Sequence, residues 1–433
     1  YNGTSVDNNN SLIDNVIRGG YYGVYWYGGG TTTLESGTVI RGNDVESYYY
    51  GIRLYYQDAP VAIDNRIAPT SAFGYALYSY YVDNDLRYER NQILLEDGYA
   101  IYMAYNDATT SQRGSIYNNM VSITGDGTAY GIYMWGTSSN QDFYHNSVYV
   151  EGSSTSRGLY ITASGSGNNV VNNIFFNGAG NYAIYVTGTN SIDQIDYNNY
   201  YNNNGGDLAY WSGAASDLAA LQALSGKDTN SISVDPLFES TTDLHAGPPV
   251  NNQGTPVGVA VDFDGETRST TVPDIGADEF TPPPFDMELM AVHTPESGCG
   301  LGNAEAINVL AKVVGTDTLF PGDTIFFGYS VNGGTAVNEP LILTDTLAFL
   351  DTFSYTLTNT VDLSSTGDYD IKVWTTITGD GDPLNDTILH YVVHAPVITN
   401  YPYMEDFETG NGGWREEGVN SSWEFGTPDG FVI

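Results

Sequence analysis

The chain has 433 residues, with 52 acidic and 13 basic side chains and a formal net charge of −39. This charge argues against a nucleic-acid backbone or an anionic membrane surface as the main partner, because phosphates would be repelled. Hydrophobic residues make up 41% of the chain, and there are 50 glycines and 36 tyrosines. Such a composition is typical of an all-β protein with many turns, and the length predicts at least two domains.

A repeat of about 27 residues runs through the first 206 residues. Each copy has two short alternating strands that bury one face only, so the copies must stack. The sequence therefore predicts a right-handed parallel β-helix over residues 1–206. An asparagine two positions before an aliphatic or aromatic residue marks each copy, and these asparagines are expected to face inward as a hydrogen-bonded column. The predicted column contains Asn15, Thr38, Asn65, Asn91, Asn119, Asn146, Asn172 and Asn198.

About ten residues after each asparagine lies a triplet of Gly or Ala, an aliphatic residue and, in most copies, a tyrosine. If the aliphatic residues face inward, these tyrosines form one outward stripe, with Arg53 in the second coil. The predicted stripe contains Tyr25, Tyr78, Tyr102, Tyr133, Tyr160 and Tyr185. Four interpretations stay open: the rings stabilise the sheet by stacking, another part of the chain covers them, they dock another protein, or they lie along a glycan.

The repeat ends near residue 200, and residues 216–224 are expected to form a short helix with Ser216 as N-cap and Gly226 as stop. Three motifs follow: Asp235-Pro236-x-Phe238, Asp262-x-Asp264-Gly265-x-x-Arg268 and Asp274-Ile275-Gly276-Ala277-x-Glu279. With these motifs, residues 207–280 resemble the closing segment of right-handed parallel β-helix proteins secreted by Bacteroidota. The resemblance implies a cap on the open end of the β-helix and an extracytoplasmic setting, and it implies no activity.

Residues 281–284 form a proline-rich linker, which is expected to be stiff. The following stretch, residues 285–396, predicts an immunoglobulin-like β-sandwich. Its expected strands are 287–292, 306–314, 324–331, 341–343, 352–357, 369–377 and 387–393. The motifs Ser297-Gly298-Cys299-Gly300-Leu301 and Asn385-Asp386-Thr387 resemble adhesion-type sandwich modules of the same bacteria. Cys299 is the one cysteine, which excludes an internal disulfide, and it is predicted to be buried.

Residues 397–433 resemble the opening of a jelly-roll domain of the MAM or lectin-like kind, on the motifs Tyr403-Met404-Glu405-Asp406-Phe407-Glu408 and Trp423-Glu424-Phe425-Gly426-Thr427-Pro428. Taken together, the resemblances imply a segment of a large exported surface protein of the type IX secretion kind, used as an adhesin or appendage. The chain is accordingly interpreted as part of a longer mature polypeptide.

A turn before the last sandwich strand places four oxygen-bearing side chains close together in sequence: Asp380, Asp382, Asn385 and Asp386. Calcium takes such ligands, so this turn is the predicted metal site and calcium the one candidate cofactor. Asp262 and Asp264 form a second candidate. The alternative is a pair of solvated turns, since aspartate is common in turns.

Parallel β-helices also host polysaccharide lyases and hydrolases, so catalysis has to be considered. Residues 1–200 contain no lysine, and their arginines are scattered. Glu35, Glu46, Glu96 and Asp97 are not paired by any motif, and His145 is interpreted as a structural residue. The sequence therefore predicts a non-enzymatic segment.

The predicted role is structural and adhesive, at the extracellular cell surface. The expected partners are other protein subunits, with self-assembly into a homo-oligomer, or a cell-surface glycan; neither nucleic acid nor membrane insertion is expected. A glycan-binding module and a polysaccharide-cleaving enzyme remain as alternatives.

Overall fold

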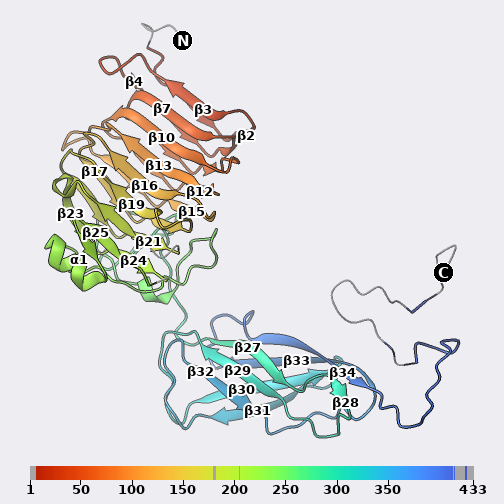
Figure 1. Ribbon diagram of the computed structural model, residues 1–433. Helices are drawn as coiled ribbons and strands as arrows, with labels where there is room; N and C mark the ends of the chain where they lie inside the picture. The colour runs from red at the N-terminus through yellow and green to blue at the C-terminus, as the bar shows by residue number, and fades with distance from the viewer. Residues whose placement is uncertain (1–5, 179–181, 204, 413, 415–424, 427–433) are drawn as a thin grey trace, which may run out of the picture. The chain divides into compact units, whose positions relative to one another are not determined.

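The computed structural model describes the whole chain except residues 1–5, 179–181, 204, 413, 415–424 and 427–433. The chain divides into two compact units, residues 1–281 and 282–433 (Figure 1). Within the described residues, strands dominate and the single α-helix has eight residues, which confirms the all-β prediction. No helix there is long and apolar enough to span a membrane.

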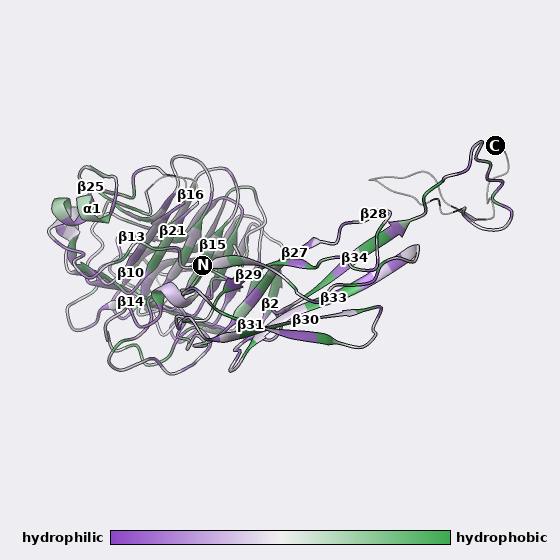
Figure 2. Cartoon of the chain, turned by 90° about the horizontal axis from the view of Figure 1, so that it is seen from below, coloured by the Kyte–Doolittle hydropathy of each residue, from purple (hydrophilic) through white to green (hydrophobic). Residues whose placement is uncertain are grey.

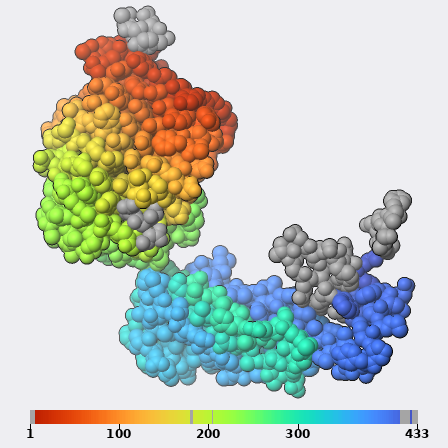
Figure 3. All heavy atoms as spheres, viewed as in Figure 1, coloured from red at the N-terminus to blue at the C-terminus, as the bar shows by residue number. Residues whose placement is uncertain are grey.

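The first unit is a parallel β-helix of three sheets, in which each strand pairs with its counterpart in the next coil. Figure 3 shows the coils stacked in chain order from red to green. The first sheet contains β1 (Ser11–Ile13), β5 (Val39–Arg41), β8 (Val61–Ile63), β11 (Arg87–Glu89), β14 (Gly114–Tyr117), β17 (Gln141–Tyr144), β20 (Asn168–Val171) and β23 (Ile192–Asp196). The second contains β2 (Val16–Arg18), β6 (Asp44–Glu46), β9 (Arg66–Ile67), β12 (Gln92–Leu95), β15 (Met120–Ile123), β18 (Ser147–Val150), β21 (Ile174–Asn177) and β24 (Asn199–Asn202).

The third sheet is the widest and carries the tyrosine stripe. It contains β3 (Tyr22–Tyr27), β7 (Tyr50–Asp58), β10 (Gly74–Asp83), β13 (Gly98–Ala104), β16 (Ala129–Trp135), β19 (Arg157–Ile161), β22 (Ile184–Val186), β25 (Ala209–Trp211) and β26 (Ala214–Ala215), with β4 (Glu35–Ser36) beside β7. Ile101 and Met103 of β13 are fully buried in the interior, as the alternation predicts. Hydrophobic residues accordingly gather on the strands of this unit (Figure 2).

The predicted asparagine column exists, with two corrections to its members. Each side-chain carbonyl oxygen accepts both the main-chain and the side-chain N–H of the asparagine one coil earlier, as Asn119 does from Asn91 at 3.1 and 2.9 Å. The column runs through Asn15, Asn43, Asn65, Asn91, Asn119, Asn146, Asn173 and Asn198.

The two errors in the column have separate causes. Thr38 is not a member, because its hydroxyl donates instead to the Gln57 carbonyl at 2.6 Å, and Asn43 fills the second coil. Asn172 lies one position too early: its backbone has a φ of +61°, which asparagine tolerates in turns, and its neighbour Asn173 enters the column. The motif alone does not separate the two asparagines, because Ile174 follows Asn172 by two positions and Phe175 follows Asn173 by two, and both are buried.

Residues 207–280 belong to the first unit. The helix α1 (Leu218–Ser225) packs Leu221 into the core at the end of the β-helix. Its N-cap is Asp217 and not the predicted Ser216, because the Asp217 carboxylate accepts the Ala220 N–H at 2.8 Å. Gly226 ends the helix in the left-handed conformation, as predicted. The remainder, with a short 3-10 helix at Pro248–Val250, runs back along the outer side of β15, β18 and β21.

Arg268 fixes this returning segment to the β-helix. Its guanidinium is almost fully buried and donates to the Asn118 side chain at 2.9 Å and to the carbonyls of Gly276 and Ala277 at 3.0 and 2.8 Å. It also pairs with Glu279 at 3.2 Å. The residues of the Asp-x-Asp-Gly and Asp-Ile-Gly-Ala motifs thus serve the packing of the segment. A buried Arg with this many acceptors is a structural residue.

The second unit is a sandwich of two sheets that share one core. The three-stranded sheet contains β27 (Met287–Thr294), β29 (Asn308–Val313) and β32 (Thr352–Thr356); the five-stranded sheet contains β28 (Gly298–Cys299), β34 (Thr387–Ala395), β33 (Gly367–Ile377), β30 (Thr324–Val331) and β31 (Val337–Ile342). Each of the seven predicted strands overlaps an observed one, but the expected strand 341–343 shares only Leu341 and Ile342 with β31, and β28 was not predicted. Cys299 is exposed and not buried, because it lies on a two-residue strand at the sheet edge.

The predicted jelly-roll segment, residues 397–433, falls largely outside the described residues. Its described positions contain no helix or strand. Of the motif at residues 423–428, Phe425 and Gly426 are described and the other four residues lie outside the described part of the chain.

Glu339 of β31 is a buried carboxylate that accepts hydrogen bonds from the chain after β32. Its carboxylate accepts five hydrogen bonds, from the Tyr355 hydroxyl and from main-chain and side-chain donors of Thr358 and Asn359, at 2.6–2.9 Å. Burial alone would raise the pKa of Glu339, but these donors outweigh burial and lower the pKa to about 2. The stabilisation is therefore present above pH 4.5 and is lost as the pH falls through 2.

We expect Glu339→Gln to lower the free energy of unfolding of the sandwich by about 3 kcal/mol at pH 7. The loss should shrink as the pH falls toward 2, because the wild-type carboxylate then becomes protonated. Denaturant titrations of both proteins at several pH values test this. A loss that does not change with pH would mean that the glutamine fails for steric reasons.

Candidate functional site

The outer side of the third sheet carries a layer of tyrosines far larger than the predicted stripe. Because the strands are parallel and in register, each outward position repeats from coil to coil. We call the resulting surface the tyrosine face. Its three columns contain Tyr22, Tyr50, Tyr75, Tyr99, Tyr130 and Arg157; Tyr25, Arg53, Tyr78, Tyr102, Tyr133, Tyr160, Tyr185 and Tyr210; and Tyr27, Tyr55, Tyr80, Ala104 and Trp135.

The middle column contains all six predicted residues, with Arg53 between Tyr25 and Tyr78 as expected. The two flanking columns were missed, although the sequence carries the signal. In several coils a tyrosine lies three residues before the predicted one, as Tyr99 precedes Tyr102 and Tyr130 precedes Tyr133.

Many successive rings in a column pack face to face, whereas Tyr75–Tyr99, Tyr102–Tyr133 and Tyr160–Tyr185 meet edge to face. Tyr78 and Tyr102 have centroids 4.5 Å apart at an interplanar angle of 10°, and Tyr99 and Tyr130 are 4.8 Å apart at 3°. Tyr102 is only 9% exposed, because neighbouring rings cover it. Stacking of this kind adds stability beyond buried area, about 0.5–1.5 kcal/mol for each pair. The first interpretation of the stripe, that the rings stabilise the sheet, therefore has direct geometric support.

Arg53 lies within the rings and has no carboxylate partner among the described ion pairs. Its guanidinium carbon is 4.3 Å from the Tyr50 ring centroid and 4.8 Å from that of Tyr55. Its nitrogens donate to the hydroxyls of Tyr22 at 3.0 Å and Tyr55 at 2.7 Å. Cation–π contacts and phenol acceptors thus replace an acidic partner.

The hydroxyls of Tyr50, Tyr99 and Tyr102 stay neutral at physiological pH. Burial is the largest cause in each case, and it raises the pKa of Tyr50, Tyr99 and Tyr102 to about 12. The face consequently presents ring edges and uncharged hydroxyls. Its most exposed members lie in the first coil, where Tyr25 is 46% and Tyr27 38% exposed.

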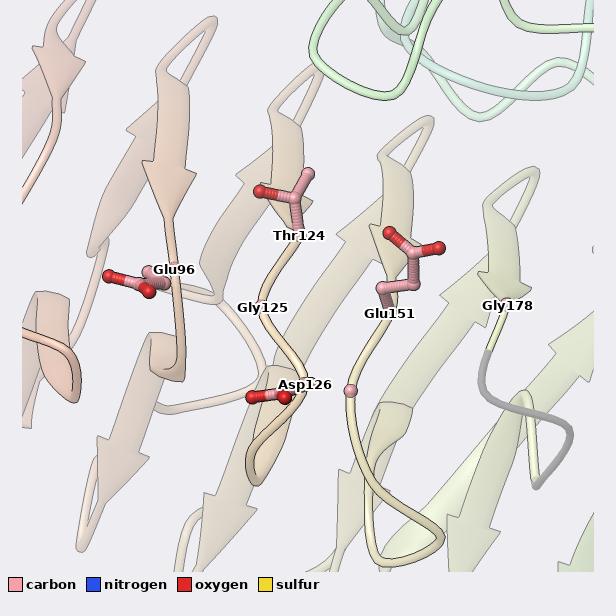
Figure 4. A pocket seen from close by; sticks show the side chains of 7 residues that line it. Glu96, Thr124, Gly125, Asp126, Glu151 and Gly178 are labelled. Carbon is pink, nitrogen blue, oxygen red and sulfur yellow. The ribbon is translucent and has the colours of Figure 1, made fainter.

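An acidic hollow of about 720 Å³ lies elsewhere on the β-helix. Glu96, Asp126 and Glu151 line it from the turns that follow β12, β15 and β18. In Figure 4 these carboxylates stand apart on three successive coils and do not converge on one point. Among the described residues that line the hollow, none is basic.

His145, the histidine of the β-helix, does not reach this hollow. It is fully buried, with Nε2 2.9 Å from the Asn172 amide nitrogen. Burial lowers the pKa of His145 well below its usual value, so the ring is neutral.

Asp262 and Asp264, the second metal candidate, lie in different surroundings and have different partners. Asp262 is fully buried and accepts the main-chain N–H groups of Glu266 and Glu279 at 2.7 and 3.0 Å. Asp264 instead lies 2.6 Å from His245 Nε2, and with Asp278 these two residues bring three ligand atoms within 4.8 Å.

His245 supplies a positive charge to the cluster that it forms with Asp264 and Asp278. Burial would lower its pKa, but hydrogen bonds to Asp264 and Asp243 outweigh burial and raise the pKa of His245 to about 9. The ring is therefore an imidazolium between two carboxylates. No motif predicted this role of His245, because Asp264 and Asp278 reach it only through the fold of the returning segment.

The first metal candidate lies in the sandwich. Asp380, Asn385 and Asp386 come together there with Asp286, a residue that sequence reasoning missed. Asp382 lies at the exposed rim, where its carboxylate accepts the Leu384 N–H at 2.9 Å.

Comparison with known proteins agrees with the geometry of the first unit. Residues 1–148 match the family model described as the right handed beta helix region. The first unit is a right-handed β-helix. The match covers about a third of the chain, and β-helix domains of this family occur in enzymes and in non-enzymes. A search of curated proteins found no match.

Two solved structures share weaker likeness with the chain. One is the CARDB domain of a Pyrococcus furiosus protein in complex with di-metal ions, with 15% identity, a TM-score of 0.19, and coverage of 27% of this chain and 91% of that one. The other is a beta-glucosidase from Listeria innocua in complex with glucose, with 14% identity, a TM-score of 0.17, and coverage of 47% and 31%. At these TM-scores neither likeness bears on fold or function.

Proposed function

We propose that this chain is a non-catalytic structural and adhesive segment of an extracellular surface protein. In this proposal the β-helix is a rigid rod, the sandwich is an immunoglobulin-like spacer, and the tyrosine face is the surface that meets a second copy of the chain. The type IX secretion setting in Bacteroidota, implied by the resemblances of the cap, the sandwich and the C-terminal segment together, belongs to the same proposal.

The proposal rests on the difference in charge between the tyrosine face and the chain as a whole. The chain has a net charge of −39, so two copies repel one another over most of their surface. The tyrosine face contains no carboxylate and two arginines, Arg53 and Arg157. The acidic residues on the same strands, Asp58 and Asp83, are the last residues of β7 and β10. Two copies can therefore approach on this face without opposing carboxylates.

The orientation of the rings favours a protein partner over a glycan. A sugar stacks its apolar side on the free face of an aromatic ring, whereas most ring faces here are occupied by the next ring of the column. What remains outward is a row of edges and hydroxyls, the amphipathic surface that tyrosine offers in protein interfaces.

Sedimentation equilibrium of the complete chain tests the proposal. We expect a defined oligomer whose dissociation constant rises at least tenfold in the double variant Tyr25→Ser, Tyr27→Ser. These two rings are exposed, so their loss leaves the buried part of the stack intact. Tyr401→Ser is the matched control, because Tyr401 is 81% exposed and lies on the second unit; it should not change the constant.

A monomer at every concentration would contradict the proposal. The glycan alternative would then gain support if soluble polysaccharides quenched tyrosine fluorescence. Cleavage of an acidic polysaccharide that disappears in Glu151→Gln would instead support the enzyme alternative at the acidic hollow.

A further inference from the structure

Four oxygen-bearing side chains of the sandwich meet where three segments of the chain come together. Asp286 directly precedes β27, Asp380 lies in the turn after β33, and Asn385 and Asp386 directly precede β34. The Asn385 side-chain amide donates to the Asp286 carboxylate at 3.1 Å. The main-chain carbonyl of Asn385 accepts the Leu289 N–H at 3.1 Å. The main chain also pairs Phe285 with Asp380 as an isolated bridge. We call these four residues the sandwich cluster.

Several oxygens of the sandwich cluster are buried without a hydrogen-bond partner. They are one carboxylate oxygen each of Asp380 and Asp386 and the side-chain oxygen of Asn385. Asp386 is only 5% exposed and Asp286 only 6%. A buried acceptor without a donor costs about 1–3 kcal/mol, and a buried charge costs more unless it is paired or binds a metal. A cation bound among these oxygens would offset this cost.

The described part of the chain supplies no positive partner for these oxygens. None of its ion pairs includes a member of the sandwich cluster. The three carboxylates of Asp286, Asp380 and Asp386 therefore gather without a basic side chain to balance their charge. The His245 cluster differs in this respect, because it holds an imidazolium of its own.

We propose that Asp286, Asp380, Asn385 and Asp386 bind a divalent cation of the calcium type. All four offer oxygen ligands, which hard cations prefer, and no nitrogen or sulfur ligand for zinc is present among them. Asp382 at the rim is placed to add a carboxylate or a water-mediated contact. Its negative charge also acts on Asp386 and Asp286.

The distances between the carboxylates of the sandwich cluster mean that binding a cation would require a local movement or a bridging water. Its three carboxylates do not bring one oxygen each within 4.8 Å of one another, as the His245 trio does. A cation would draw the turn that contains Asp380 toward Asp286, or reach one carboxylate through water, as in other calcium loops. Binding would then tie the first strand of the sandwich to the turn before its last strand.

Calorimetric titration of the complete chain with calcium chloride tests this site, beside thermal unfolding in calcium and in EDTA. We expect the unfolding temperature of the sandwich to rise by about 10 °C when calcium is a hundredfold above its dissociation constant. Hydrogen exchange of peptides covering residues 285–290 and 378–388 should slow in calcium, which assigns the effect to the sandwich cluster.

Asp386→Asn is expected to change the unfolding temperature differently in calcium and in EDTA. The variant should lose calcium binding and the calcium-dependent shift, yet unfold in EDTA at the wild-type temperature or above, because one buried charge is gone. Asp286→Asn should behave in the same way, which keeps the test valid if one variant fails to fold. Asp370→Asn, an exposed residue of β33, removes the same charge and should bind calcium as the wild type does.

Two results would overturn the site. One is a wild-type chain whose sandwich shows neither heat of binding nor slower exchange in calcium. The other is calcium binding that persists in Asp386→Asn and Asp286→Asn but disappears in Asp264→Asn, which would place the ion at the His245 cluster.

Discussion

Replacing Asn119 with alanine is expected to lower the free energy of unfolding of the β-helix by about 4 kcal/mol. The Asn119 side chain accepts two hydrogen bonds from Asn91 and donates to the Asn146 carbonyl oxygen at 2.9 Å and to the main-chain carbonyls of Tyr88 and Tyr117 at 3.0 and 3.1 Å. Alanine removes all five and leaves buried donors and acceptors without partners. Each orphaned group costs about 1–3 kcal/mol, and the sum is reduced because neighbouring coils relax.

Hydrogen exchange measures this loss at the affected coil. The Asn91 amide N–H donates to Asn119 Oδ1, so we expect its exchange in Asn119→Ala to accelerate by about a thousandfold, the equivalent of 4 kcal/mol. Asn203→Ala, at an exposed turn position, is the control and should leave exchange unchanged. Unchanged protection of the Asn91 amide in Asn119→Ala would mean that the column contributes little to stability.

Asp228→Asn is expected to stabilise the first unit at pH 8 by up to about 4 kcal/mol, three pKa units at about 1.4 kcal/mol each. Asp228 is 1% exposed; its Oδ1 accepts the hydroxyls of Tyr200 at 2.7 Å and Ser231 at 2.8 Å, while its Oδ2 has no partner. Burial raises the pKa of Asp228 to about 7, although the two hydroxyl donors lower it in part.

The sign of the pH dependence follows from proton binding. Between about pH 4 and 7 the folded protein holds a proton on Asp228 that the unfolded chain has lost, so the wild-type free energy of unfolding falls as the pH rises. Asparagine removes this dependence, so the gain of the variant should be small at pH 4 and largest above pH 7. Thermal unfolding at pH 4, 6 and 8 tests this, with the exposed Asp193→Asn as control. A gain of the same size at every pH would contradict the assignment.

The β-helix could be predicted from the sequence because its signal is repeated in every coil. The aliphatic residues of each triplet, such as Ile101 and Ile132, recur at one register, and parallel stacking then decides which residues share a column. The middle tyrosine column could be predicted from this register, because its residues directly follow the aliphatic ones. Local errors arose where one coil departs from the motif, as where Asn43 replaces the expected Thr38 in the column.

The candidate sites were less accessible to sequence reasoning, since their members are distant in the chain. Asp380, Asn385 and Asp386 lie in one turn and were found, whereas Asp286 is 99 positions from Asn385 and joins them only through sandwich packing. His245 and Asp264 likewise meet only because the segment after α1 folds back along the β-helix. Burial of the tyrosine face also could not be foreseen, because it depends on ring contacts between coils.

The central claim is that the tyrosine face forms the contact between copies of the chain. Hydroxyl-radical footprinting read by mass spectrometry tests it most directly, at concentrations well below and well above that of assembly. The account predicts protection at high concentration of the exposed rings Tyr25 and Tyr27, with Tyr401 equally reactive at both concentrations. Equal reactivity of Tyr25 and Tyr27 in an assembled sample, with protection elsewhere, would contradict it.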